Sequence, residues 1–176
     1  MSDVVYMAPP MSRANIEAGT MAIRQLLGLT DPFLDVARLL EFGLKGIAPG
    51  FEFQVLDREV MGSRHGQMDP AERTVALRLD VYEGLIAHRG RDRFTACHEI
   101  GHAVLHGSRL NRLGPGMRPP AAYRDPEWQA NTFAGALLMP AHMMVVCGSI
   151  EDAVEEFGVT EDAARVRARI LKLEIS

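Results

Sequence analysis

The chain has 176 residues, of which 47% are hydrophobic and 24% are charged, as in an ordinary globular domain. The 19 basic and 23 acidic side chains give a formal charge of -4, which excludes a general electrostatic attraction for nucleic acid or anionic lipid. Two cysteines cannot build a disulfide framework, and residues 1–10 lack the basic start and apolar run of a signal peptide. Together these features predict a reducing, cytoplasmic setting.

Helical periodicity predicts that residues 12–47 form N-terminal helices. Ser12 is a typical capping residue, and the apolar residues after it recur at spacings of three and four until Gly28. Asp31 and Pro32 are typical of the start of a second helix, which occupies the rest of this segment.

The periodicity then changes to two, which predicts a small sheet over residues 51–88. Apolar and polar residues alternate at 51–56 and again at 75–79, so both segments are expected to be half-buried strands. Residues 84–88 are a candidate third strand, and the segment between the first two strands is expected to be a polar turn.

Helical signals return in the second half of the chain. They predict a helix over residues 92–106, a loop over 107–124 that holds four arginines and no acid, and helices over 125–139 and 149–173. No internal repeat or linker is apparent, so we expect a single domain over residues 1–176. The capping residues expected for the later helices are Asp125, Ser149 and Thr160.

One uncharged stretch, between Glu127 and Glu151, is long enough in principle to cross a bilayer. Polar residues interrupt it, and Pro140 would break a helix near its middle. We therefore expect two buried helices there and no membrane segment.

Residues 98–102 read His-Glu-Ile-Gly-His, which is the HExxH pattern on a predicted helix. His98 and His102 lie one turn apart on the same helix face and can present two imidazole nitrogens to one divalent ion. Glu99 would lie beside that ion and can act as a general base toward water. The alternative is an amphipathic helix whose histidines are satisfied by hydrogen bonds.

A catalytic metal site of this kind needs a third protein ligand and an open position for water. Glu127, in the first turn of the helix predicted over 125–139, is the best candidate, and Asp125 is the second candidate for this ligand. Asn131 lies one turn further on and can accept a hydrogen bond from a ligating histidine, which would set the tautomer of that ring. The alternative for Glu127 is a purely electrostatic role at its helix N-terminus.

An oxyanion formed during hydrolysis would need a donor as well. His106, one turn beyond His102, and Tyr123 are the candidates. The alternative for His106 is a cap at the C-terminal end of its helix, where a cationic ring is favoured. Cys97 points about 100 degrees away from the neighbouring His98 on a helix, so we expect a buried structural thiol.

The segments Arg93–His106 (RFTACHEIGHAVLH) and Asn131–Pro140 (NTFAGALLMP) resemble the ImmA/IrrE metallopeptidase family. The resemblance implies an α+β fold, a mainly helical zincin-like domain with a small antiparallel or mixed β-sheet. The chain departs from the family pattern at Gln129, where members often carry an acid, and at Ala136, where they carry a glutamate.

The same resemblance implies that His98, His102 and Glu127 bind zinc and that Glu99 is the catalytic acid and base. Zinc is the chemical default for two histidines and one glutamate, and Mn²⁺ or Fe²⁺ can occupy similar ligands. Members often accompany helix-turn-helix repressors in prophages, mobile elements, toxin-antitoxin or stress-response loci, and some cleave them. The implied function is a cytoplasmic zinc endopeptidase with such a protein as substrate, and the strand at 75–79 is the one expected to pair with it.

Two other functions compete with this one. Residues 153–166 have the helix, glycine turn and second helix of a DNA-binding regulator, but six acids and no base between Glu151 and Asp162 oppose contact with phosphate. A zinc-containing binding regulator or toxin without turnover would share every ligand with the enzyme. Only a test of activity separates those two.

Overall fold

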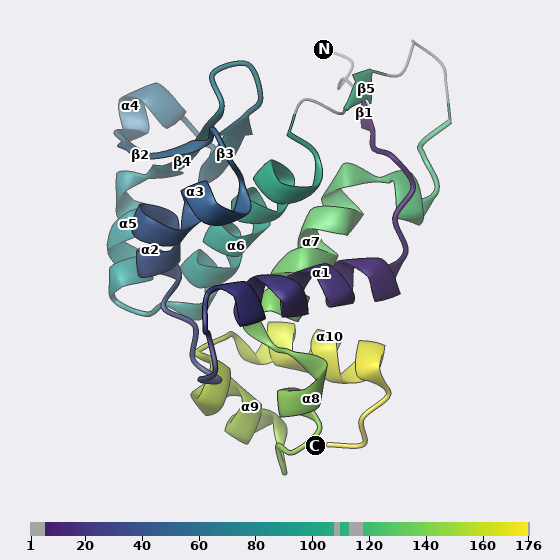
Figure 1. Cartoon of the computed structure of the whole chain (residues 1–176). Helices are drawn as coiled ribbons and strands as arrows, with labels where there is room; N and C mark the ends of the chain where they lie inside the picture. The colour runs from purple at the N-terminus through teal and green to yellow at the C-terminus, as the bar shows by residue number, and fades with distance from the viewer. Residues whose placement is uncertain (1–5, 108–109, 113–117, 176) are drawn as a thin grey trace.

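A computed structural model describes residues 6–107, 110–112 and 118–175 (Figure 1). The sheet lies against helices of the middle of the chain, and the last helices gather at the opposite end of the molecule. In chain order the elements are β1 (Tyr6–Met7), α1 (Arg13–Leu26), α2 (Val36–Arg38), the π-helical turn η1 (Leu39–Gly43), α3 (Leu44–Ile47), β2 (Glu52–Leu56), α4 (Arg58–Met61), β3 (Gly66–Asp69), β4 (Thr74–Arg78), α5 (Leu79–Ile86), α6 (Gly90–Leu105), β5 (Asn111–Arg112), η2 (Ala122–Arg124), α7 (Pro126–Leu138), α8 (Ala141–Met144), α9 (Ile150–Phe157) and α10 (Glu161–Leu171).

The fold is α+β, with a three-stranded mixed sheet in the order β2-β4-β3. Strand β4 lies in the centre, parallel to β2 and antiparallel to β3. Its residues Val75 and Leu77 are fully buried, because one face of the central strand packs into the core. A separate two-stranded ribbon pairs β1 with β5.

Two predictions about the sheet were wrong. Residues 84–88 are not a strand: they lie at the end of α5 and just after it, and the third strand is β3, where the sequence predicted a polar turn. The four residues of β3 are all half-buried and show no apolar alternation, so pairing with β4 specifies this strand and the local pattern does not. Because β4 is central, its two edges are already paired and residues 75–79 cannot add a substrate strand.

Side-chain caps begin most of the longer helices where the sequence predicted. Ser12, Asp125, Ser149 and Thr160 each accept a hydrogen bond from a backbone N–H in the first turn of the helix that follows. The second helix begins later than predicted, since the Asp35 side chain accepts from the N–H of Arg38 and starts α2 at Val36.

Helices α6 and α7 pack closely at the centre of the core. Ala96 and Ile100 on α6 and Ala134 on α7 are fully buried. Gly101 permits this approach, because a Cβ there would lie 3.0 Å from the ring of Phe133 on α7. The contact brings the first turn of α7 beside the middle of α6, where the HExxH residues lie.

The uncharged stretch between Glu127 and Glu151 forms α7 and α8, which separate at Pro140 as predicted. In the part of the chain that the structure describes, no helix has both the length and the apolar character needed to cross a membrane.

Candidate metal centre

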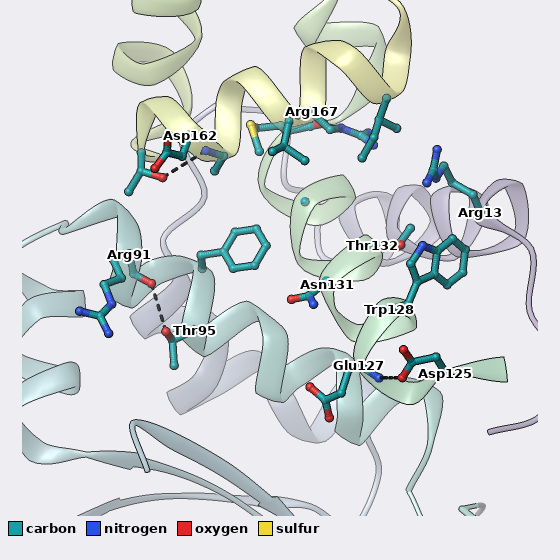
Figure 2. Close-up of a pocket in the computed structure, with 17 residues that line it drawn as sticks. Arg13, Arg91, Thr95, Asp125, Glu127, Trp128, Asn131, Thr132, Asp162 and Arg167 are labelled. Carbon is teal, nitrogen blue, oxygen red and sulfur yellow. Dashed lines mark hydrogen bonds between the residues drawn. The ribbon is translucent and has the colours of Figure 1, made fainter. Parts of the chain in front are cut away.

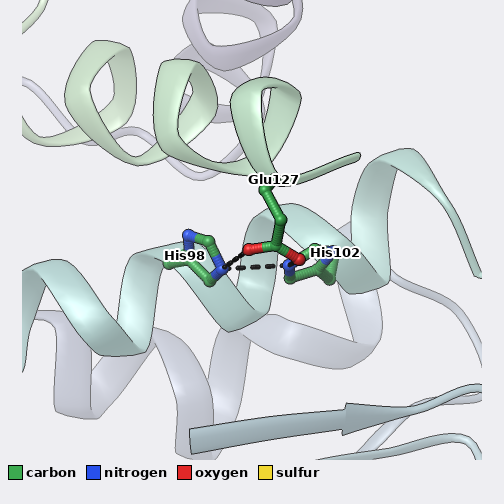
Figure 3. A group of neighbouring side chains, drawn as sticks. All are labelled: His98, His102 and Glu127. Carbon is green, nitrogen blue, oxygen red and sulfur yellow. Dashed lines mark hydrogen bonds and ion pairs between the residues drawn. The ribbon is translucent and has the colours of Figure 1, made fainter. Parts of the chain in front are cut away.

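Three side chains from two helices converge at one point (Figure 3). His98 and His102 extend from α6, and their Nε2 atoms are 2.9 Å apart. Glu127 reaches them from the first turn of α7, with carboxylate oxygens 3.2 Å from Nε2 of His98 and 3.3 Å from Nε2 of His102. One potential ligand atom from each residue lies within 4.8 Å of the others, which is a spacing that one ion can bridge.

A hydrogen bond to Asn131 sets the tautomer of His98. The Oδ1 atom of Asn131 lies 3.0 Å from Nδ1 of that ring. An amide oxygen only accepts, so Nδ1 carries the proton and donates it. The lone pair of His98 is therefore on Nε2, which is the atom that faces His102 and Glu127.

A longer relay sets the tautomer of His102. Nδ1 of His102 lies 3.0 Å from Nδ1 of His106, and Nε2 of His106 lies 2.9 Å from Oε1 of Gln129. The amide nitrogen of Gln129 donates to the backbone carbonyls of Pro9 and Tyr123, at 2.9 and 2.8 Å, so its oxygen must be the atom that faces His106. That oxygen accepts from Nε2 of His106.

The ring of His106 must then be neutral and accept at Nδ1. Burial is the main cause that lowers its pKa to about 4, against the opposing hydrogen bond with Gln129. Since Nδ1 of His106 accepts, Nδ1 of His102 is the donor, and the lone pair of His102 also lies on Nε2. When both rings are neutral, the two Nε2 lone pairs and the Glu127 carboxylate thus face one another with no hydrogen between them.

The electrostatics of this cluster favour a positive charge. Burial alone would lower the pKa of His98, but the hydrogen bond that the protonated ring donates to Glu127 and the charge of Glu99 outweigh burial and raise that pKa. Hydrogen bonds with His102 and His98 hold the pKa of Glu127 well below its usual range. Two imidazole nitrogens and one carboxylate are a donor set that fits zinc.

Glu99 lies beside the cluster and outside it. Its side chain is 9% exposed and lies against β3, where a Cβ at Gly66 would come within 2.6 Å of its Cγ. Burial raises the pKa of Glu99, and the charges of the two neighbouring histidines oppose that rise. A carboxyl group with a raised pKa next to a metal centre is suited to proton transfer near neutral pH.

The other residues named from the sequence lie elsewhere. His106 is 1% exposed and both its ring nitrogens bond within the protein, so it has no nitrogen free to meet an oxyanion. The side chain of Asp125 caps α7. The side chain of Tyr123 is half exposed, and the backbone carbonyl of Tyr123 accepts a hydrogen bond from the amide of Gln129. Cys97 is fully buried, as predicted. The predicted basic loop 107–124 lies partly outside the described residues.

Sequence reasoning missed the part that Gln129 plays, and noticed the residue only as a departure from a family pattern. Its amide joins His106 to the carbonyls of Pro9 and Tyr123, and those partners are far apart in the chain. The signal in the sequence was an uncharged amide two residues after the predicted ligand Glu127, and the burial of this amide is evident only from the fold.

The cluster opens into a cleft of about 640 Å³. Its walls include the three converging residues, Glu99, and residues Gln67 and Met68 of β3. Strand β3 pairs with β4 alone among the described strands, so its other edge faces this region unpaired.

Comparison with known proteins agrees with this geometry. The family model described as the IrrE N-terminal-like domain matches residues 65–169, more than half of the chain, and this range includes α6 and α7. The chain is 31% identical over 163 residues to the radiation response metalloprotease IrrE of Deinococcus deserti, an alignment that covers 92% of this chain and 51% of that protein. The chain therefore spans about half the length of this curated relative. With its α+β zincin-like fold, the chain belongs to the ImmA/IrrE family of metallopeptidases.

Proposed function

We propose that this chain is a zinc-dependent endopeptidase in which His98, His102 and Glu127 hold one zinc ion. The observation that carries the proposal is the convergence of a carboxylate with two imidazole nitrogens that have lone pairs in the neutral rings. Such an arrangement needs a positive charge between the three groups, either a proton or a metal ion, and the donor set fits zinc. Mn²⁺ or Fe²⁺ are the alternatives for the same ligands.

A zinc ion bound there would lower the pKa of its water ligand and polarise the carbonyl of the scissile peptide bond. Glu99 supplies the proton transfers. Its carboxylate accepts a proton from the attacking water and then delivers it to the amine that leaves. Asn131 and His106 hold the two rings in the orientation that this chemistry requires, and we assign His106 this positioning role in place of the oxyanion contact expected from the sequence.

We further propose that the substrate is a regulatory protein, such as a helix-turn-helix repressor or antitoxin of a prophage, mobile element or stress-response locus, cut in the cytoplasm. The family resemblance supports this choice, together with the name of the relative, a radiation response metalloprotease. The unpaired edge of β3 beside Glu99 supports an extended substrate, since peptide can add to a sheet edge by main-chain hydrogen bonds.

Glu99→Gln separates the enzyme from a protein that only binds. The variant keeps the three proposed ligands, so we expect one zinc per chain by metal analysis, as in the unmodified protein. Cleavage of a repressor encoded beside the gene should fall by at least 100-fold, because the amide cannot accept the proton. Loss of zinc from His98→Ala is the matched control for the metal.

Two outcomes would contradict this function. Unchanged cleavage by zinc-loaded Glu99→Gln would remove Glu99 from the mechanism. Full biological activity of that variant without any cleavage would favour a regulator or toxin that acts by binding.

A role in DNA binding gains no support from the exposed charges of the last two helices. In α10, Arg167 is buried and bonds to the carbonyl of Met139 and to Glu17, while the Arg165 guanidinium pairs with Glu161. The first turn of α10 carries Glu161 and Asp162, which would repel phosphate.

A further inference from the structure

A second cavity, of about 660 Å³, lies between α6, α7 and α10 and has Glu127 and Asn131 in its lining (Figure 2). Glu127 forms part of both this cavity and the cleft at the metal centre, so the two spaces share a wall. From Glu127 and Asn131 the cavity follows α7 toward α10, with α6 forming its other side. We call it the α7 groove. Its volume is in the range of ligand-binding pockets, which is roughly 300–1,000 Å³.

The lining of the α7 groove is mainly apolar. Phe94 of α6 and Trp128 of α7 are half-buried, and Val166 of α10 is 49% exposed. Apolar surface of this kind gains free energy when another apolar group removes it from water. The groove therefore favours a ligand with large apolar side chains.

The charged residues that line the groove favour neither an acidic nor a basic ligand. Arg13 and Arg91 line the groove together with Asp125 and Asp162, and the carboxylate of Glu127, a third acid in the lining, faces His98 and His102. Arg167 also lines it, but its guanidinium is occupied by Glu17 and by the carbonyl of Met139. A strongly acidic or basic peptide would gain nothing here over a neutral one.

We propose that the α7 groove binds the substrate chain on one side of the scissile bond and selects large apolar side chains at those positions. The inference rests on the proposed peptidase function and adds a substrate class to it. A peptide that crosses His98 and His102 in the cleft lies against β3 on one side and reaches Glu127, whose side chain also lines the α7 groove.

Gly135 provides a way to block the groove without disturbing the core. It lies in the lining, and a Cβ built there meets no atom within 4 Å. Leucine also has a better helix propensity than glycine, so Gly135→Leu should fold. Gly19 on α1 is the matched control, because its added Cβ also meets open space and the residue does not line the groove.

The first test measures cleavage of quenched fluorescent octapeptides of randomised sequence. We expect the zinc-loaded protein to prefer large apolar residues on one side of the cut, and Gly135→Leu to lower kcat/KM for those peptides at least tenfold. Gly19→Leu should keep the original preference and rate. Equal cleavage of polar and apolar peptides, or an unchanged rate in Gly135→Leu, would overturn the proposal.

The second test does not depend on catalysis. Trp128 is the one tryptophan of the chain and lies in the groove, so its emission reports occupancy. Titration of the Glu99→Gln variant with acetyl-Leu-Phe-Leu-amide should shift this emission to saturation, whereas acetyl-Ser-Gln-Ser-amide should not. Gly135→Leu added to that variant should raise the dissociation constant at least tenfold, and Gly19→Leu should not change it.

The two tests separate the possible failures. Saturable binding that Gly135→Leu blocks, in a protein that cuts no peptide, would refute the proposed function and leave the groove as an apolar peptide site. Cleavage that proceeds without any response of Trp128 would refute the groove alone. Dimerisation that Gly135→Leu abolishes, measured by light scattering, would assign the groove to a second copy of the chain and overturn the proposal.

Discussion

Gln129 is the residue on which the orientation of His102 depends. Its amide is fully buried and makes three hydrogen bonds, two as donor to backbone carbonyls and one as acceptor from His106. The direction of each bond determines the next, so the position of one amide oxygen places the lone pair of His102 on the atom that faces Glu127. A neutral amide suits this relay, because it donates and accepts at the same time.

Gln129→Met keeps the size of the side chain and removes the relay. We expect the zinc dissociation constant, measured by competition with a chelating dye, to rise by about 10–100-fold, as for other partners of ligating histidines. Gln25→Met on the exposed face of α1 is the control and should bind zinc normally. Unchanged affinity in a folded Gln129→Met protein would show that His106 needs no support from this residue.

The two cysteines should differ in reactivity. Burial raises the pKa of Cys97 to about 12, despite the nearby Arg93 and Arg24, so its thiol stays protonated at pH 8. The pKa of the half-exposed Cys147 is also raised, by burial and by Glu156, so its labelling should be slow at pH 7 and accelerate as pH rises. We expect iodoacetamide to modify one thiol in the native protein, detected by mass spectrometry, and none in Cys147→Ser. Modification of Cys97 at pH 8 before unfolding would contradict its burial.

The pair α6 and α7 builds the centre because small residues meet where the helices touch. Gly101 lies one residue before the proposed ligand His102, and across from it lie Phe133 and Ala130 of α7. The distance between the helices thus determines how far Glu127 stands from the two imidazoles.

Gly101→Leu should separate these helices. A Cβ at this position already lies 3.0 Å from the Phe133 ring and 3.3 Å from the backbone of Ala130, so a leucine must displace α7. We expect the free energy of unfolding to fall by about 1–3 kcal/mol and zinc affinity to fall with it. Gly101→Ala should show the same changes at smaller size in urea unfolding and metal titration. Wild-type zinc affinity in Gly101→Leu would show that the distance between α6 and α7 does not determine how far Glu127 lies from the two imidazoles.

The sequence was most informative where the signal is local. Ser12 and Thr160 begin helices with their own side chains, and the HExxH residues lie one turn apart on any helix, so these features could be predicted. Strand β3 could not, because its residues show no alternation and it forms by pairing with β4. The same reason hid Gln129 and the α7 groove, which depend on elements brought together from distant parts of the chain.

At the scale of the whole molecule, buried arginines connect the C-terminal helices to the rest. The guanidinium of Arg93 on α6 donates to the carbonyls of Phe157 and Gly158 at the end of α9, at 3.0 and 2.8 Å, and lies 3.9 Å from the ring centre of Phe33. Arg24 of α1 donates in the same way to the carbonyl of Leu137 at the end of α7. These cations satisfy helix-terminal carbonyls that would otherwise be buried without partners.

Arg93→Met tests whether the molecule unfolds as one unit. The change keeps apolar bulk against Phe33 but leaves two buried carbonyls without a donor, so we expect the free energy of unfolding to fall by about 3 kcal/mol. Arg169→Met, at an exposed position on α10, should change it by less than about 0.5 kcal/mol. Since Arg93 joins α6, which carries two of the proposed ligands, to α9, urea unfolding followed by circular dichroism should remain a single transition that zinc shifts to higher urea. A separate early transition in the unmodified protein, insensitive to zinc, would show that the C-terminal helices fold independently of α6. The wall of the α7 groove that α10 forms would then be free to move relative to the candidate metal centre.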